Sequence, residues 1–158
     1  MYTANAAPGV KGVIVGGAIV VEAARTWIGT PFHLGAAVKG AGADCYGLLL
    51  GVWREVTGGE VPAPAWQYGS DWAALPAFTS QFKEHLSNIA VPVEDVAPGD
   101  IVVFGLGPDK WLHGGIDLGD GTFCHALAEA PARVLTSCFE AKPWAGRVVA
   151  RLRFCVMF

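Results

Sequence analysis

The sequence is poor in charged residues and has no closely spaced cysteines. Charged side chains make up only 16% of the 158 residues, and the formal net charge of −3 argues against a basic surface for nucleic acid. The four cysteines, at positions 45, 124, 138 and 155, show neither the short spacing of a structural zinc site nor the pattern of a disulfide framework. We therefore expect no metal, no other cofactor and no nucleic-acid partner.

The sequence also lacks an apolar run long enough to cross a membrane. The longest uncharged apolar run, Gly12 to Val21, has about half of the roughly 20 residues that a bilayer span needs. It continues directly into Glu22 and Arg25 with no convincing small-residue cleavage site, so we interpret it as part of the fold. We expect neither a membrane span nor a signal peptide.

Hydrophobic residues, in contrast, are abundant. They make up 53% of the sequence, and the mean hydropathy of +0.40 is higher than that of an ordinary soluble domain. Some of this apolar surface is expected to be covered by another protein. The length predicts a single domain over residues 1–158, preceded by an irregular Ala/Pro/Gly-rich arm over residues 1–12.

The period of the apolar residues changes from helical to extended near Val91. Helical spacing predicts helices over residues 17–28, 45–57 and 70–88, the last capped by Ser70-Asp71. Extended segments are predicted over residues 101–104, 111–118, 122–127, 134–138 and 147–155. N-terminal helices followed by antiparallel strands indicate an α+β fold.

A cysteine stands at the start of the second predicted helix. A glycine-rich loop runs into Asp44, a good N-cap, and Cys45 follows at the first helical position. This places the thiol at the positive end of the helix dipole, which favours the thiolate, and makes the Cys45 backbone amide a candidate oxyanion donor. A buried cysteine alone is usually only a small hydrophobic residue, so a catalytic role requires a base nearby.

Two histidines lie on opposite strands of a predicted hairpin around Gly119-Asp120-Gly121. A two-residue Asp120-Gly121 turn would make His113 face away from His125. A three-residue loop with Gly121 in the left-handed region would bring both imidazoles to one face, with Cα atoms roughly 7–8 Å apart. The sequence permits either. If this face meets the cysteine helix, Cys45 is the nucleophile, His113 its base and His125 the group that orients the base.

The other histidines and a metal site offer competing hypotheses. His85 follows polar residues late in a predicted helix and is expected to face solvent, whereas His33 lies in the loop before the cysteine helix and could line a site. A metal site would be built from Cys45, His113, Cys124 and His125, and it would need the last two together. They are neighbours on a strand and point to opposite faces, so one ion cannot easily bind both.

Three motifs occur in a fixed order along the chain, separated by unrelated sequence. They are Trp27-Ile28-Gly29-Thr30-Pro31-Phe32, Asp44-Cys45-Tyr46-Gly47-Leu48 and the segment from His113 to Ala126, with a strand entry from Pro98 to Phe104 before the last. This ordered set resembles the NlpC-type cell-wall peptidases, which are papain-like cysteine hydrolases. The resemblance implies a nucleophile at Cys45, a base at His113 and a third residue at His125.

The resemblance also implies a substrate. Such enzymes cleave amide bonds in peptidoglycan stem peptides, commonly between D-glutamate and a diamino acid. Phe32, Asp44 and Tyr46 occupy positions expected to contact this substrate. Phe32 stands where the family usually has tyrosine, and Tyr46 where it usually has serine, so substrate recognition is expected to differ from that of relatives.

Within the family, the chain looks most like the branch found in phage tails and gene transfer agents. Val38-Lys39-Gly40, the small size and the absence of a wall-binding repeat carry this resemblance. It implies a component of a virion-like tail that is made in the bacterial cytoplasm, docks on tail-tip or baseplate proteins and opens the wall locally during DNA delivery. The alternatives are a structural tail-tip subunit with little turnover, or a papain-like amidase or acyltransferase acting on a non-wall substrate.

Overall fold

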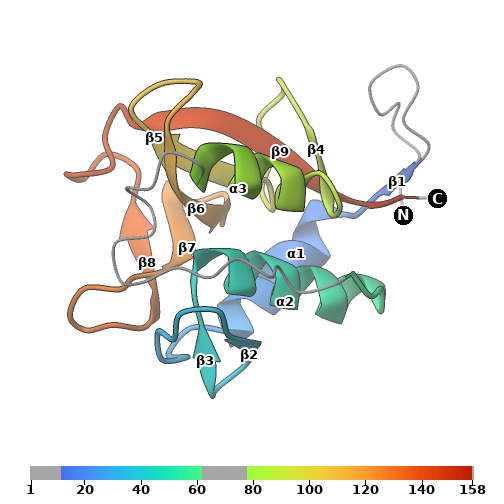
Figure 1. The fold of residues 1–158 in the computed structure, drawn as a ribbon, viewed down its shortest axis with the longest axis horizontal. Helices are drawn as coiled ribbons and strands as arrows, with labels where there is room; N and C mark the ends of the chain where they lie inside the picture. The colour runs from blue at the N-terminus through green and yellow to red at the C-terminus, as the bar shows by residue number, and fades with distance from the viewer. Residues whose placement is uncertain (1–11, 62–77, 158) are drawn as a thin grey trace.

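The computed structural model describes residues 12–61 and 78–157, and it has the predicted α+β architecture (Figure 1). The helices are α1 (Gly17–Thr26), α2 (Cys45–Thr57) and α3 (Phe78–Leu86). The strands are β1 (Gly12–Ile14), β2 (Ala37–Val38), β3 (Gly42–Ala43), β4 (Ala90–Pro92), β5 (Ile101–Gly105), β6 (Trp111–Asp117), β7 (Thr122–Ala126), β8 (Val134–Cys138) and β9 (Val148–Met157). Residues 1–11 of the predicted arm over residues 1–12, and the predicted helix start at Ser70, lie outside the described residues, whereas Gly12 begins β1.

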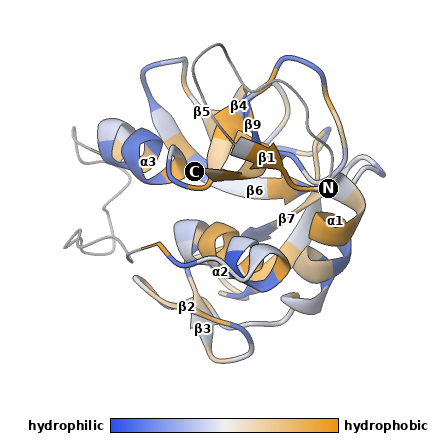
Figure 2. Cartoon of the chain, turned by 90° about the vertical axis from the view of Figure 1, so that its right-hand side faces the viewer, coloured by the Kyte–Doolittle hydropathy of each residue, from blue (hydrophilic) through white to orange (hydrophobic). Residues whose placement is uncertain are grey.

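One antiparallel sheet organises the molecule. Its strand order is β1-β9-β5-β6-β7-β8, and β4 adds a further pairing to β9. The helices α1 and α2 lie side by side, and α2 packs against β6 and β7 (Figure 1). The strands β1, β4 and β9 are largely hydrophobic, and hydrophobic residues also occur on α1 and α2, whereas α3 is largely hydrophilic (Figure 2). The apolar run from Gly12 thus forms β1 and the start of α1, as expected for a segment of the fold.

The helix α2 begins and ends at the predicted residues. The Asp44 side chain caps it by accepting a hydrogen bond from the Gly47 amide at 2.7 Å, and Gly58 ends it in the left-handed conformation at φ 67°. All residues from Cys45 to Trp53 are buried. A helix buried on every side at its first turn holds Cys45 in a fixed position.

The β6–β7 hairpin takes the three-residue loop. Ile116 pairs with Cys124, and the Leu118 amide donates to the Thr122 carbonyl at 3.0 Å. Gly121 has a φ of 84°, in the left-handed region that a bulged three-residue loop requires. Of the two registers that the sequence permits, the structure has the one that places both histidines on one face.

In the described part of the chain, no helix has the length and apolar character needed to span a bilayer.

Candidate active site

Three polar side chains from neighbouring strands form a hydrogen-bonded chain. His113 Nε2 on β6 lies 2.8 Å from His125 Nδ1 on β7, and His125 Nε2 lies 2.8 Å from Ser137 Oγ on β8. His125 is fully buried and His113 is half-buried. The register of the hairpin creates the first bond, and the pairing of β7 with β8 creates the second.

An indole ring covers the two imidazoles. Trp144 stacks on His113 with ring centroids 5.3 Å apart and meets the edge of His125 at 4.9 Å. Burial lowers the pKa of His113 to about 3, with a smaller contribution from His125, and burial lowers the pKa of His125 to about 4. Both imidazoles are therefore neutral at pH 7, and each can act as a proton acceptor.

The sulfur of Cys45 lies against the middle of β6, at Gly114. The side chain is 1% exposed, and the backbone amides of Tyr46 and Gly114 are hydrogen-bonded toward it. Gly114 directly follows His113, and it has no side chain to separate the helix from the strand. A Cβ atom at position 114 would lie 3.0 Å from Phe82 and 3.4 Å from Leu49. Glycine thus permits the close approach of α2 and α3 to β6.

The resting state of the thiol differs from the one predicted. Burial raises the pKa of Cys45 well above its ordinary value, and the Asp44 carboxylate raises it further. The surrounding backbone amides lower it, but less. The prediction of a thiolate was wrong for this resting state because it counted the helix dipole and not the loss of water around the sulfur. Cys45 and His113 therefore both rest in their neutral forms.

The three residues predicted to contact substrate differ in their exposure: Asp44 and Tyr46 are buried, and Phe32 is half-buried. Asp44 is 2% exposed, and its second oxygen accepts from the Gly35 amide at 2.7 Å, which anchors the preceding loop. Tyr46 is also 2% exposed, and burial raises its pKa to about 12. Its ring packs on Phe82 and its hydroxyl donates to the His85 carbonyl at 3.4 Å. Phe32 is half-buried, beside Ala43 of β3.

The remaining candidates lie outside the hydrogen-bonded chain. His33 is exposed, next to Gly42. His85 is half-buried rather than fully solvent-facing, because the Tyr46 ring lies 5.7 Å from it. Cys124 donates its thiol hydrogen to the Ala24 carbonyl at 3.6 Å, toward α1. Across residues 12–61 and 78–157, no three His, Cys, Asp or Glu side chains are grouped in a way that could hold a metal ion.

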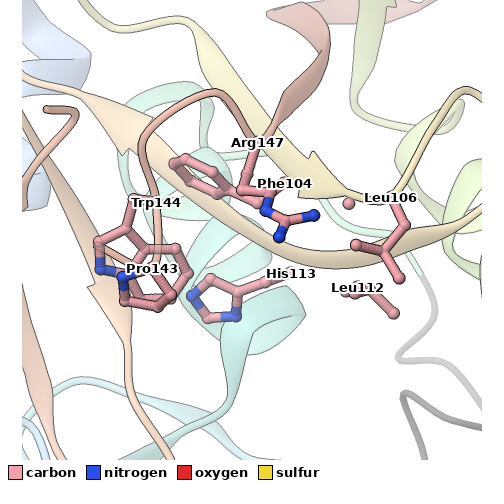
Figure 3. Close-up of a pocket in the computed structure, with 8 residues that line it drawn as sticks. Phe104, Leu106, Leu112, His113, Pro143, Trp144 and Arg147 are labelled. Atoms are coloured by element: carbon pink, nitrogen blue, oxygen red, sulfur yellow. The ribbon is translucent and has the colours of Figure 1, made fainter. Parts of the chain in front are cut away.

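A pocket of about 250 Å³ opens beside His113 (Figure 3). Its walls are mostly apolar, and they come from Phe104, Leu106, Leu112, Pro143 and Trp144. Its polar side chains are the imidazole of His113 and the guanidinium of Arg147.

Sequence reasoning missed Ser137, Trp144 and Arg147. Ser137 lay in a predicted strand whose neighbour in the sheet was unknown. Trp144 and Arg147 lie in the segment before β9, where no periodic pattern marks a residue as part of a site.

Known proteins resemble this chain over most of its length. A probable endopeptidase of Mycobacterium tuberculosis is 32% identical over 117 residues, which are 73% of this chain and 25% of that protein. A probable endopeptidase of Corynebacterium glutamicum is 35% identical over 111 residues, which are 70% of this chain and 43% of that protein. The chain therefore spans less than half the length of these two curated relatives.

The crystal structure of the NlpC/p60 domain of the peptidoglycan hydrolase SagA has a similar fold. Its TM-score is 0.57 at 25% sequence identity, and the match covers 91% of this chain and 100% of that one. The sequence model of the NlpC/P60 family matches residues 29–153, which include Cys45, His113 and His125. Since this match takes in most of the sequence, the chain belongs to the NlpC/P60 family.

Proposed function

We propose that this protein is a cysteine peptidase that hydrolyses amide bonds in the stem peptides of peptidoglycan. The observation that carries the proposal is the hydrogen-bonded chain from His113 through His125 to Ser137, together with the hydrogen bond from the Gly114 amide, next to His113 in the sequence, toward the buried thiol of Cys45. Family membership, the two probable endopeptidases and the peptidoglycan hydrolase SagA support this class of reaction and substrate.

The hydrogen-bonded chain can set the proton positions that a base requires. Ser137 Oγ accepts from His125 Nε2–H, which leaves His125 Nδ1 as an acceptor. His113 Nε2–H then donates to that nitrogen, and His113 Nδ1 keeps a free lone pair. In this arrangement His113 Nδ1 is the base, and His125 orients it and fixes its tautomer.

The reaction then follows from two neutral partners. The Cys45 thiol gives its proton to His113 Nδ1 as the sulfur attacks the carbonyl carbon of the substrate. Backbone amides at the start of α2, including that of Cys45, stabilise the negative oxygen of the tetrahedral intermediate. The imidazolium of His113 protonates the leaving amine, and water hydrolyses the resulting thioester. Attack from a neutral thiol avoids a thiolate–imidazolium pair in the resting site, where burial disfavours charge.

Substrate contacts are proposed at the residues that flank Cys45. Phe32 is half-buried and is the candidate for direct contact. Asp44 and Tyr46 act by holding the elements around the substrate in place. Asp44 binds the loop at Gly35, and Tyr46 packs α2 against α3. The apolar ring at Phe32 and the buried Tyr46 hydroxyl support a recognition of the substrate's amine end that differs from that of relatives.

The setting we propose is the tail of a phage-like particle, where this single peptidase domain, residues 1–158, docks on tail-tip or baseplate proteins. The resemblance to that branch and the apolar composition support it. Large hydrophobic side chains are exposed at Val38, Val96 and Leu106, with relative exposures of 60%, 65% and 57%. Made in the bacterial cytoplasm, the subunit would act at the wall during DNA delivery. Detection of the chain in purified tail particles tests this setting.

The test of the peptidase is release of peptides from purified peptidoglycan. Cys45→Ala should lower turnover by about 10⁴-fold or more, because it removes the nucleophile. Cys138→Ala, at an exposed position on β8, is the matched control and should keep wild-type turnover. Undiminished activity in Cys45→Ala would exclude the assignment. A folded wild-type protein that releases nothing would favour the structural tail-tip subunit.

A further inference from the structure

The loop between β6 and β7 has a sequence that fits two hairpin registers. Asp120-Gly121 is a preferred dipeptide of the two-residue type I′ turn, and in that turn Gly119 and Thr122 exchange both of their backbone hydrogen bonds. The structure instead has the three-residue loop, in which the Leu118 amide donates to the Thr122 carbonyl at 3.0 Å. A group outside the turn dipeptide must therefore contribute to the choice of register.

Both amides that the two-residue turn would pair are bound by carboxylates instead. The Gly119 amide donates to Asp117 Oδ1 at 2.8 Å. The Thr122 amide donates to Asp120 Oδ1 at 3.1 Å. The side chain of Asp120 is 53% exposed, whereas that of Asp117 is 8% exposed. Because water competes less for a buried carboxylate, Asp117 holds its amide more firmly.

The second oxygen of Asp117 is bound from outside the hairpin. Arg151 Nη1 on β9 lies 2.9 Å from Asp117 Oδ2, and the Arg151 side chain is 19% exposed. The guanidinium also lies over the ring of Phe139, 5.6 Å from its centroid. The carboxylate is thus neutralised and held in one orientation by a neighbouring strand, so its bond to the Gly119 amide is directed by the rest of the fold.

Asp117 and His113 are four residues apart on β6, so their side chains share one face of the strand. A shift of the register by one residue would turn both side chains to the opposite face. That face now carries Ile116, which is fully buried in the main core. The Asp117 carboxylate would then leave Arg151 and enter apolar surroundings, which is costly for an unpaired charge.

We propose that Asp117, held by Arg151, is the positioning residue that selects the three-residue loop and so keeps His113 Nε2 against His125 Nδ1. The inference rests on the proposed function, in which His113 is the base. Asp117 acts on the reaction only through the strand that carries this histidine. Since only the observed register joins the two imidazoles, losing the selection lowers the fraction of active molecules, and with it kcat, at an unchanged KM.

The experiment combines kinetics on peptidoglycan peptides with NMR of the hairpin in Asp117→Ala and Asp117→Asn. Asp117→Ala frees the Gly119 amide, so kcat should fall about 10- to 100-fold with little change in KM. Cross-strand NOEs should then report Gly119–Thr122 pairing beside the wild-type Leu118–Thr122 pairing. Asp117→Asn keeps an oxygen for the Gly119 amide and should restore most of the turnover. Equal losses in the two variants, or Leu118–Thr122 pairing alone in a folded Asp117→Ala, would overturn the inference.

Two arginines of β9 provide a matched control. Arg153 pairs with the buried Asp100 as Arg151 pairs with the buried Asp117. Arg151→Met and Arg153→Met each leave a buried carboxylate without this cation, so both should lower the Tm. Only Arg151→Met should populate the two-residue turn. This comparison decides the matter if Asp117→Ala does not fold: the three-residue loop alone in Arg151→Met, or the two-residue turn in both variants, overturns the inference.

The NMR readout separates failure of this inference from failure of the proposed function. The two-residue turn in Asp117→Ala supports the positioning role even if the wild-type protein releases no peptide. A wild-type protein that cleaves peptidoglycan, with an Asp117→Ala variant that loses activity while its three-residue loop stays intact, retains the proposed function and overturns the positioning role.

Discussion

The two halves of the candidate site depend on different ranges of the sequence. Cys45 is positioned by its immediate neighbours: Asp44 caps α2, and its two oxygens bind the amides of Gly47 and Gly35. His113 and His125 are positioned by the hairpin loop, by β8 and by Trp144. A nucleophile at a helix start is thus set by a few consecutive residues, whereas its base depends on strand register and on later parts of the chain.

Among changes to the histidine half of the site, a change of the hairpin register should have the largest effect. Gly119 has a φ of 82°, which valine adopts only with strain, and a Cβ there would lie 2.7 Å from Pro98. Gly119→Val therefore favours the two-residue Asp120-Gly121 turn, in which Gly119 is extended and His113 faces away from His125. We expect kcat/KM to fall about 10³-fold, the size of a lost general base.

The control for this variant is Gly29→Val. Gly29 also has a positive φ, 94°, with open space around it, but it lies outside the hairpin. Both variants should lose stability in thermal unfolding, and only Gly119→Val should lose the His113–His125 contact in NMR spectra. Equal losses of activity in the two would show that the hairpin register is not what matters.

Acid should destabilise the histidine half of the site. Burial lowers the folded-state pKa of His125 from 6.5 to about 4, so the unfolded chain binds a proton more readily. The contribution of neutral His125 to the free energy of unfolding is fully present above about pH 6.5 and is lost as the pH falls toward 4. The loss corresponds to about 3 kcal/mol, since one pKa unit is worth about 1.4 kcal/mol. Urea unfolding between pH 7 and pH 4 measures it.

His125→Asn is the comparison for the acid effect. Asparagine can still accept from His113 but takes up no proton in this range, so the stability of the variant should depend less on pH between 6.5 and 4. The same slope in wild type and variant would assign the acid sensitivity to other groups.

Removing the last hydroxyl of the hydrogen-bonded chain should have the smallest effect. Ser137→Ala takes away the acceptor of His125 Nε2–H, so His125 can move its proton to Nδ1 and donate to His113 Nε2. The proton of His113 then lies on Nδ1, which can no longer act as the base. We expect kcat to fall about tenfold with little change in KM, as for a group that positions the base. Ser137→Thr should restore turnover. Thr136→Ala, at an exposed position on the same strand, should have no effect.

The parts of the fold that the sequence predicted are those with local causes. The Asp44 cap, the α2 limits and the strand β5 follow from neighbouring residues, and all were predicted closely. The two-residue strands β2 and β3 have too few residues to show a period. Ser137 could not be recognised because its contact depends on which strand lies beside β7. The raised pKa of Cys45 could not be predicted from the helix dipole because it depends on how completely the sheet covers the sulfur.

Trp144 has a consequence for the charge that catalysis would create. In the resting state its ring stacks on a neutral His113, with the ring planes inclined by 30° and the centroids 5.3 Å apart. When His113 takes the thiol proton, the same geometry becomes a cation above an aromatic face, an attraction of about 0.5–2 kcal/mol. The indole therefore favours the imidazolium of His113 over the neutral ring, whereas the burial of the site disfavours it. A tryptophan that packs as a hydrophobic cover at rest becomes the counterpart of a short-lived positive charge.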